Sequence, residues 1–330
     1  MTYTRLFSPG RIGGLELKNR IVMPAMGCSL AESTGEAGAR IIAYYAARAK
    51  GGAGLIITEI TRVDDETGVG TPNQLSVTNT HVVPQLYRLA EAVHAYDTKL
   101  FVQLHHPGNQ TPSRLIGGKQ PVSASNVTCR VIGEEPRALT TEEVEAMVRK
   151  FVTGAVIAQK AGVDGVEIHA AHGYLLCQFF SPITNRRKDA WAGYTLEGRT
   201  RFPLSVIRAV RSAVGDSFPI SVRYGCCDYL PGGSTVDDAA AAAPSFAEAG
   251  ADLFDVSGGM CRYQRPEHPE PGYFSDQTAA VKKAASVPVA LAGGIRTPEQ
   301  AEQFLEEEKA DLIGIGRLSL SPGVDFSGWF

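Results

Sequence analysis

The stretch Ile21-Val22-Met23-Pro24-Ala25-Met26 decides between two folds that the rest of the chain would allow. Its apolar start is typical of a buried parallel β-strand. A doubly wound nucleotide-binding sheet would follow its first strand with a Gly-x-Gly-x-x-Gly turn. Here proline and small apolar residues follow instead, which favours a closed barrel over a doubly wound sheet.

Seven further apolar runs follow this one along the chain. The eight candidate strands are 21–25, 54–59, 99–104, 165–168, 220–223, 253–256, 287–292 and 311–315. The segments between them predict helices over 36–50, 82–96, 142–161, 196–214, 236–249, 275–285 and 298–306. Eight strands that alternate with helices predict an α/β fold, the (β/α)8 TIM barrel, as a single domain over residues 1–330.

Two segments fall outside this alternation. Residues 6–17, with Gly13-Gly14 near the centre, predict a short hairpin before the first strand, which would plug the bottom of the barrel. Residues 107–138 are rich in Pro, Gly, Ser and Asn and show little periodicity, so they predict a long excursion after the third strand. Because barrel enzymes carry their chemistry at the carboxyl ends of the strands, this excursion would lie over the active face.

Composition and charge narrow the classes of partner. The 32 basic and 35 acidic residues give a net charge of −3, which argues against nucleic acid and anionic lipid as partners. The sequence contains neither a signal-peptide pattern nor a long apolar span, and its six cysteines have no zinc-finger spacing. We therefore expect a cytoplasmic protein that binds small molecules, with homo-oligomerisation left open.

Polar side chains gather where the fourth predicted strand ends. Residues 167–174 read Glu-Ile-His-Ala-Ala-His-Gly-Tyr. His169 and His172 supply hydrogen-bond donors there, and Tyr174 supplies a possible proton donor. This cluster favours a catalytic role over that of structural histidines.

Charged and glycine-rich ends mark three other strands. Arg223 ends the fifth strand, where a permanent charge needs either a neighbouring carboxylate or an anionic ligand. Gly293-Gly294 and Gly316-Arg317 follow the last two strands, where glycine lets backbone N–H groups approach a phosphate and arginine can bind it in a bidentate manner. The pattern predicts a phosphorylated cofactor or substrate, with tight turns and a surface arginine as the alternative.

Several of these segments, taken together, resemble the Old Yellow Enzyme family of FMN-dependent ene-reductases. The resemblance is strongest to the branch that contains 2,4-dienoyl-CoA reductase-like barrels and bacterial NADH:flavin oxidoreductases. The matching segments are 7–9, 17–24, 103–105, 169–175, 181–182, 185–187 and 314–317.

The resemblance implies that FMN lies across the mouth of the barrel. Its binding residues would be Pro24, Ala25, Met26, Gln103, Arg223, Gly293, Gly294, Gly316 and Arg317. Pro24, Ala25 and Met26 would line the flavin ring. The phosphate would be held by Gly293, Gly294, Gly316 and Arg317. Gln103 would bind the pyrimidine edge, and Arg223 would lie beside flavin N1 and O2, where reduction places negative charge.

The resemblance also implies a reaction. NADH or NADPH would reduce FMN, and the flavin N5 would then pass a hydride to the β-carbon of an α,β-unsaturated carbonyl compound in a ping-pong cycle. His169 and His172 would bind the carbonyl oxygen, while Tyr174 would give the proton to the α-carbon.

Departures from the family pattern concern the mouth and the end of the chain. Gly27 stands where many relatives place a Thr or Cys that contacts the flavin, and a substitute role for Cys28 is left open. The loop over 257–274 is rich in polar and aromatic groups, so it is either the selectivity loop or an ordinary solvated one. Since no cysteine follows Cys261, we expect no iron–sulfur cluster.

Two functions other than that of an FMN-dependent ene-reductase are compatible with parts of the sequence. His105, His106, His169 and His172 could ligate a metal in a barrel hydrolase, but the strand ends lack the His-x-His plus Asp pattern of a two-metal site. A flavin-binding barrel without catalysis is the other alternative, against which the histidines, Tyr174 and Arg223 argue.

Overall fold

Eight parallel strands close into a barrel in the computed structural model, which describes residues 3–265, 267–321, 323 and 325–329. The barrel strands are β3 (Ile21–Met23), β4 (Leu55–Arg62), β5 (Lys99–His105), β8 (Gly165–Ala170), β9 (Ile220–Cys227), β10 (Leu253–Gly258), β11 (Val289–Ala292) and β12 (Leu312–Gly314). Each pairs in parallel with the next, and β12 pairs with β3 to close the ring. The predicted TIM barrel is confirmed, while the assignment of residues 1–330 to one domain stays a prediction.

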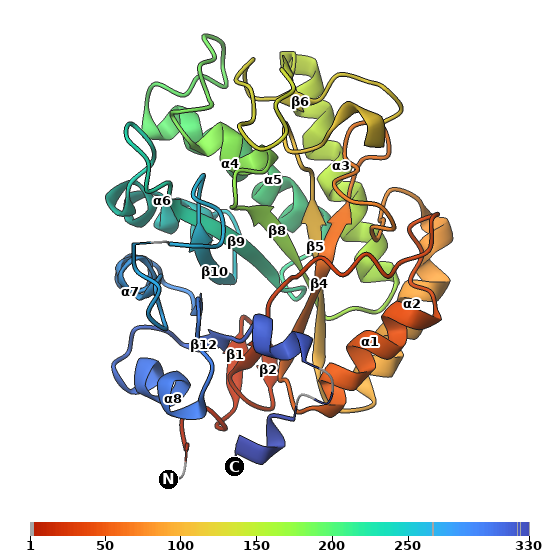
Figure 1. The fold of residues 1–330 in the computed structure, drawn as a ribbon, viewed down its shortest axis with the longest axis vertical. Coiled ribbons are helices and arrows are strands. Elements are labelled where there is room, and N and C mark those ends of the chain that lie inside the picture. Colours follow the sequence, from red (N-terminus) through yellow and green to blue (C-terminus); the bar gives the residue numbers. More distant parts are fainter. Residues whose placement is uncertain (1–2, 266, 322, 324, 330) are drawn as a thin grey trace.

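Helices surround the barrel, as Figure 1 shows. They are α1 (Ala39–Lys50), α2 (Val83–His94), α3 (Thr141–Lys160), α4 (Leu175–Phe180), α5 (Leu196–Val214), α6 (Val236–Glu248), α7 (Ser275–Ala284) and α8 (Pro298–Glu306). Short 3₁₀ turns occur at Thr80–Val82, Ser113–Leu115, Arg317–Leu320 and Ser327–Trp329. Seven of the helices lie where the sequence predicts them, and α4 is an addition.

The hairpin of β1 (Gly10–Ile12) and β2 (Leu15–Leu17) seals the bottom of the barrel. Gly13 turns the hairpin with a φ of 54°, a conformation that glycine adopts at little cost. Ile12 and Leu17 are fully buried. They pack with inward-facing side chains at the amino ends of the strands, namely Val22, Leu55, Ile57, Phe101, Leu253, Ala290 and Leu312. The predicted plug is therefore confirmed.

The predicted excursion after β5 lies beyond the carboxyl ends of the strands. It contains a small parallel pair, β6 (Val122–Ser123) with β7 (Arg137–Ala138), which the sequence did not predict. Figure 1 places β6 and α4 above the arrowheads of β5 and β8. The excursion thus lies on the face where barrel enzymes carry their active sites.

The C-terminal segment packs against the end of helix α1. The Phe326 amide donates to the Gly51 carbonyl at 2.6 Å, and the Trp329 ring lies 5.3 Å from the Phe326 ring. Phe330 lies outside the described residues. Among the residues described, no helix has the length and apolar character needed to cross a membrane, and a cytoplasmic location stays a prediction.

The plug gives a test of stability. Leu17→Ala should lower the free energy of unfolding by about 2–5 kcal/mol, because it leaves a cavity where the surrounding strands cannot collapse. Chemical denaturation of the cofactor-free protein measures the effect, and Glu16→Ala, at an exposed position of the same strand, is the control. A Leu17→Ala effect as small as that of the control would show that the hairpin does not seal the core.

Candidate active site

A tight turn places two of the predicted catalytic residues at the end of β8. His172 and Gly173 both adopt left-handed backbone angles, with φ of 60° and 73°. The His172 amide donates to the Gly258 carbonyl at 3.0 Å, which ties the turn to the end of β10. Tyr174 then begins α4, a helix whose six residues are all buried. Since α4 is anchored in the core, Tyr174 is held firmly at the mouth.

Four aromatic rings meet at this mouth. The centroid of the Tyr174 ring lies 4.8 Å from that of His169 and 4.5 Å from that of His105, in edge-on arrangements. The His169 and His172 rings lie 5.0 Å apart. The structure therefore brings the three predicted catalytic residues together. It adds His105 from β5, whose place in the cluster could have been inferred from its position at a strand end.

Burial keeps this cluster uncharged. Desolvation holds the pKa values of His105, His169 and His172 well below the ordinary histidine value, and for His169 and His172 the charge of Arg223 acts in the same direction. Burial also raises the pKa of the Tyr174 phenol. At neutral pH the mouth thus offers neutral imidazoles and a protonated phenol, which can donate hydrogen bonds without an attached charge.

A layer of buried charged and amide side chains lies deeper in the barrel. Gln103 Nε2 donates to Glu167 Oε1 at 2.8 Å, and Ser221 Oγ donates to Glu167 Oε2 at 2.8 Å. Arg223 forms an ion pair with Asp255 on the neighbouring strand. The Arg223 charge is thus matched by a carboxylate, which was one of its two predicted partners.

The two buried carboxyl groups have raised pKa values. Burial, with the charge of Asp255, raises the pKa of Glu167 to about 8. Burial also raises the pKa of Asp255, although Arg223 opposes the shift. Glu167 is therefore protonated at neutral pH, and the layer as a whole carries little net charge.

Several polar atoms in this region are buried without a partner among the residues described. They are Gln103 Oε1, His105 Nε2, Arg223 Nε and Asp255 Oδ1. A buried polar atom without a hydrogen bond costs about 1–3 kcal/mol, so such atoms point to a missing ligand or water. An isoalloxazine edge, which has N–H, carbonyl and ring nitrogen groups, offers partners of the right kind. The residues present therefore fit FMN.

The predicted phosphate residues lie at the ends of the closing strands. Gly293 and Gly294 have φ of 154° and 72°, and the Tyr273 ring lies over both. A Cβ on Gly316 would lie 3.4 Å from Met26 Sδ and 3.6 Å from Pro24 Cγ, so closure brings Gly316 beside the end of β3.

The two remaining predicted residues of this region are accessible. Arg317 is exposed, and within the described part of the chain its guanidinium has no hydrogen-bond partner. Ala25 is partly buried and continues from Pro24 after β3. Both are thus available to a ligand, although the structure does not itself test their predicted roles.

Cys28 is engaged with a carboxylate. Its thiol and its backbone amide both donate to Glu59 Oε2, at 3.1 and 2.7 Å. Burial, with the nearby Glu59 charge, raises the pKa of Cys28 to about 12. Cys28 is therefore a thiol at neutral pH, held by hydrogen bonds to Glu59.

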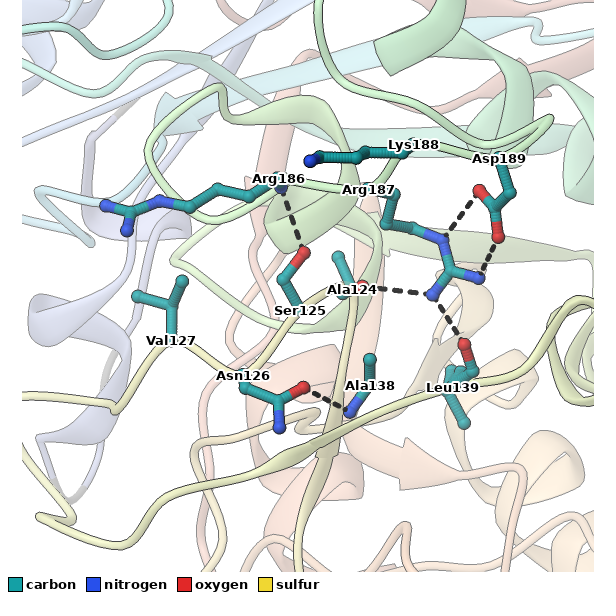
Figure 2. A pocket seen from close by; sticks show the side chains of 10 residues that line it. All are labelled: Ala124, Ser125, Asn126, Val127, Ala138, Leu139, Arg186, Arg187, Lys188 and Asp189. Atoms are coloured by element: carbon teal, nitrogen blue, oxygen red, sulfur yellow. Dashed lines mark hydrogen bonds and ion pairs between the residues drawn. The ribbon is translucent and has the colours of Figure 1, made fainter.

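A separate pocket of about 680 Å³ lies between the excursion and the segment that follows α4 (Figure 2). Arg187 closes one side, where it donates to the Ala124 and Leu139 carbonyls and pairs with Asp189. These bonds tie the excursion to the barrel. The predicted catalytic and cofactor residues do not line this pocket.

The metal alternative receives no support from this arrangement. His106 turns away from the other three histidines toward Asp64, at 3.4 Å. Across residues 3–265, 267–321, 323 and 325–329, no group of three or more His, Cys, Asp or Glu side chains is placed to hold a metal ion.

Comparisons with known proteins agree with this geometry. The sequence profile of the NADH:flavin oxidoreductase / NADH oxidase family matches residues 5–323. The NADH oxidase of Thermoanaerobacter brockii is 43% identical over 319 residues, 96% of this chain and 49% of that protein. The NADPH dehydrogenase of Listeria welshimeri is 37% identical and covers 95% of this chain and 90% of its own.

A solved structure, that of morphinone reductase in complex with tetrahydroNAD, superposes with a TM-score of 0.81 at 26% identity. The match covers 94% of this chain and 86% of that one. The chain spans about half the length of several curated relatives that it matches, among them the Thermoanaerobacter enzyme.

The raised pKa of Glu167 gives a test through stability. Between pH 5 and 8 the folded protein keeps a proton on Glu167 that the unfolded chain has lost, so stability falls as pH rises. Glu167→Gln should remove this loss, and the two unfolding curves should diverge by on the order of 1 kcal/mol per pH unit in favour of the variant. Denaturation of the cofactor-free proteins measures it. If the free energies of unfolding of wild type and Glu167→Gln change in parallel with pH, as expected for the exposed control Glu16→Gln, the raised pKa of Glu167 is contradicted.

Proposed function

The chain belongs to the NADH:flavin oxidoreductase / NADH oxidase family, and from this premise we propose that it reduces the C=C bond of α,β-unsaturated carbonyl compounds at the expense of NAD(P)H. The family confirms the predicted resemblance to the Old Yellow Enzymes, the flavin oxidoreductase class and FMN as the cofactor. NADH or NADPH as the electron donor, the substrate and the roles of individual residues are proposals.

The observation that carries this proposal is the meeting of His169, His172 and Tyr174 at the mouth. Two neutral imidazoles side by side can donate two hydrogen bonds to one carbonyl oxygen, which would withdraw electron density from a conjugated C=C bond. The Tyr174 ring lies edge-on beside the His169 ring, which supports a role for both residues at one substrate.

The cofactor would be held from several strand ends. Pro24, Ala25 and Met26 would line one side of the ring system. Gln103 and Arg223 would use their unpartnered Oε1 and Nε atoms at its polar edge. Gly293, Gly294, Gly316 and Arg317 would bind its phosphate. When bound there, FMN would supply the capacity for hydride transfer between NAD(P)H and the substrate.

Tyr174 would supply the proton to the α-carbon. Its pKa is raised by burial, so the phenol retains its proton until the substrate develops negative charge. The His169–His172 pair would stabilise that charge on the carbonyl oxygen.

A spectroscopic experiment tests the proposal. The purified protein, saturated with FMN, should lose its flavin absorbance when NADH or NADPH is added without oxygen, and should regain it when 2-cyclohexenone is added. A protein that binds no FMN, or that remains reduced in the presence of several enones, would contradict the proposed function.

Tyr174→Phe tests the proton donor. It should slow the reoxidation of the reduced protein by an enone about 10²–10⁴-fold, because only this half-reaction needs a proton at carbon. Stopped-flow absorbance should show that reduction by NAD(P)H stays within a few-fold of the wild-type rate. Equal slowing of both half-reactions would remove Tyr174 from this role.

Arg317→Gln tests the phosphate site. Because Arg317 would bind only the phosphate, the variant should bind FMN about 10–100-fold more weakly while its affinity for riboflavin stays unchanged. Fluorescence titration of the cofactor-free protein measures both constants, and Arg296→Gln, an exposed cation in the neighbouring loop, is the control. An equal loss for both flavins would place Arg317 elsewhere.

A further inference from the structure

The loop after β10 carries an arginine at the mouth that the proposed reaction does not use. Arg262 is partly buried and adopts a left-handed backbone with φ of 67°, which is uncommon outside glycine. Its amide donates to the Gly259 carbonyl at 3.0 Å. A Cβ on Gly258 would lie 2.0 Å from the Arg262 carbonyl oxygen, so the turn depends on glycine at that point. Strained residues that the surroundings hold in place are concentrated at functional sites.

Two hydrogen bonds tie this arginine to the catalytic turn. Arg262 Nη2 donates to Gln110 Oε1, and Gln110 Nε2 donates to the His172 carbonyl at 2.7 Å. The adjacent Tyr263 ring lies edge-on to the His172 ring, with 5.9 Å between the centroids. Burial lowers the pKa of His172 and raises that of Tyr174, and the charge of Arg262 adds to the first shift and opposes the second. Its guanidinium therefore lies close enough to reach a molecule bound at the mouth.

This guanidinium has no counter-ion in the part of the chain that the structure describes. Arg265, in the same loop, pairs with Asp276, and the buried Arg223 pairs with Asp255. Around Arg262 lie an amide, neutral imidazoles and a phenol. A partly desolvated cation without a carboxylate loses hydration and gains no ion pair, so the site is prepared for an anion from outside.

We propose that Arg262 binds a carboxylate of the substrate, which makes this protein selective for α,β-unsaturated ketones that carry a carboxylate a short distance from the carbonyl group. The proposal rests on the proposed function, since the carbonyl oxygen would occupy the His169–His172 pair. A planar guanidinium matches a carboxylate in shape and number of donors. A phosphate dianion carries more charge than one guanidinium neutralises.

The chemistry of the reduction stays the same. The C=C bond gains one hydride and one proton, two electrons in all, and NAD(P)H is oxidised to NAD(P)+. The carboxylate neither forms nor breaks a bond. Its part is to orient the substrate, with the carbonyl oxygen toward the two histidines and the C=C bond between the cofactor and Tyr174.

Two substrates that share the ketone and the C=C bond, one with a free carboxylate and one with an uncharged ester, test the proposal. The probes are 4-oxopent-2-enoate and its methyl ester, which share the ketone and the C=C bond. The wild-type protein should favour the acid in kcat/KM. Arg262→Gln should reduce kcat/KM for the acid about 10–100-fold, mostly through KM, and leave the ester within a few-fold. Arg262→Lys keeps the positive charge but loses the planar pair of N–H donors. Its kcat/KM for the acid should lie between those of the wild type and Arg262→Gln.

A matched control separates a specific contact from the loss of one positive charge. Arg186→Gln removes an exposed arginine whose guanidinium forms no hydrogen bond to the residues described, and it should leave the preference for the acid intact. If Arg186→Gln and Arg262→Gln change the ratio of kcat/KM for the acid to kcat/KM for the ester equally, the preference is a general effect of positive charge and the proposed contact is contradicted.

Binding of the saturated acid gives a readout without catalysis. Calorimetric titration of the FMN-loaded protein with 4-oxopentanoate should show binding that Arg262→Gln weakens about 10–100-fold, while methyl 4-oxopentanoate is unaffected. If wild type and variant bind the acid equally, the proposal is overturned even when enones are reduced. If neither probe is reduced but the acid still binds through Arg262, the proposed function fails and the anion site stands.

Discussion

Closure of the barrel between its last strand and its first is the constraint on which the site depends. Strand β12 pairs with β3 through only Ile313 with Ile21 and Gly314 with Val22. On its other side Gly314 permits the close approach of β11, because a Cβ there would lie 2.7 Å from the Ala292 Cβ. Without the pairing of β12 with β3, both strands would have an unpaired edge. Closure also brings Gly316, after the last barrel strand, beside Pro24, after the first, at the place where a cofactor would bind.

Burial then sets the electrostatic character of the barrel from bottom to top. The plug and the inward side chains above it are apolar, and the next layer holds Glu167, Arg223 and Asp255. The same desolvation that raises the pKa of Glu167 lowers that of His169 two residues later on the same strand. Both groups are neutral at pH 7 for one reason. The mouth therefore offers hydrogen bonds with little fixed charge. Against this neutral background, the charge of Arg262 at the rim would distinguish anionic substrates from neutral ones.

The sequence predicted the barrel well because buried parallel strands are almost continuously apolar, and this pattern needs no knowledge of the fold. Strand ends were less predictable. Strand β9 continues from Arg223 to Cys227, because the residues after Arg223 remain paired with β10. Helix α4 was missed since all six of its residues are buried, so it has no polar face and no amphipathic period.

Contacts between distant segments were beyond the sequence. The choice between a carboxylate and a ligand for Arg223 depended on the register that places Asp255 opposite it, 32 residues later. The bond from Arg262 to Gln110 joins residues 152 positions apart, in two loops whose composition indicates only that they are polar. Positions on strands follow from the closure of the barrel, whereas positions on loops follow from side chains that meet after it closes. This difference explains why the reaction class can be inferred from the strand ends, while the choice of substrate depends on the loops.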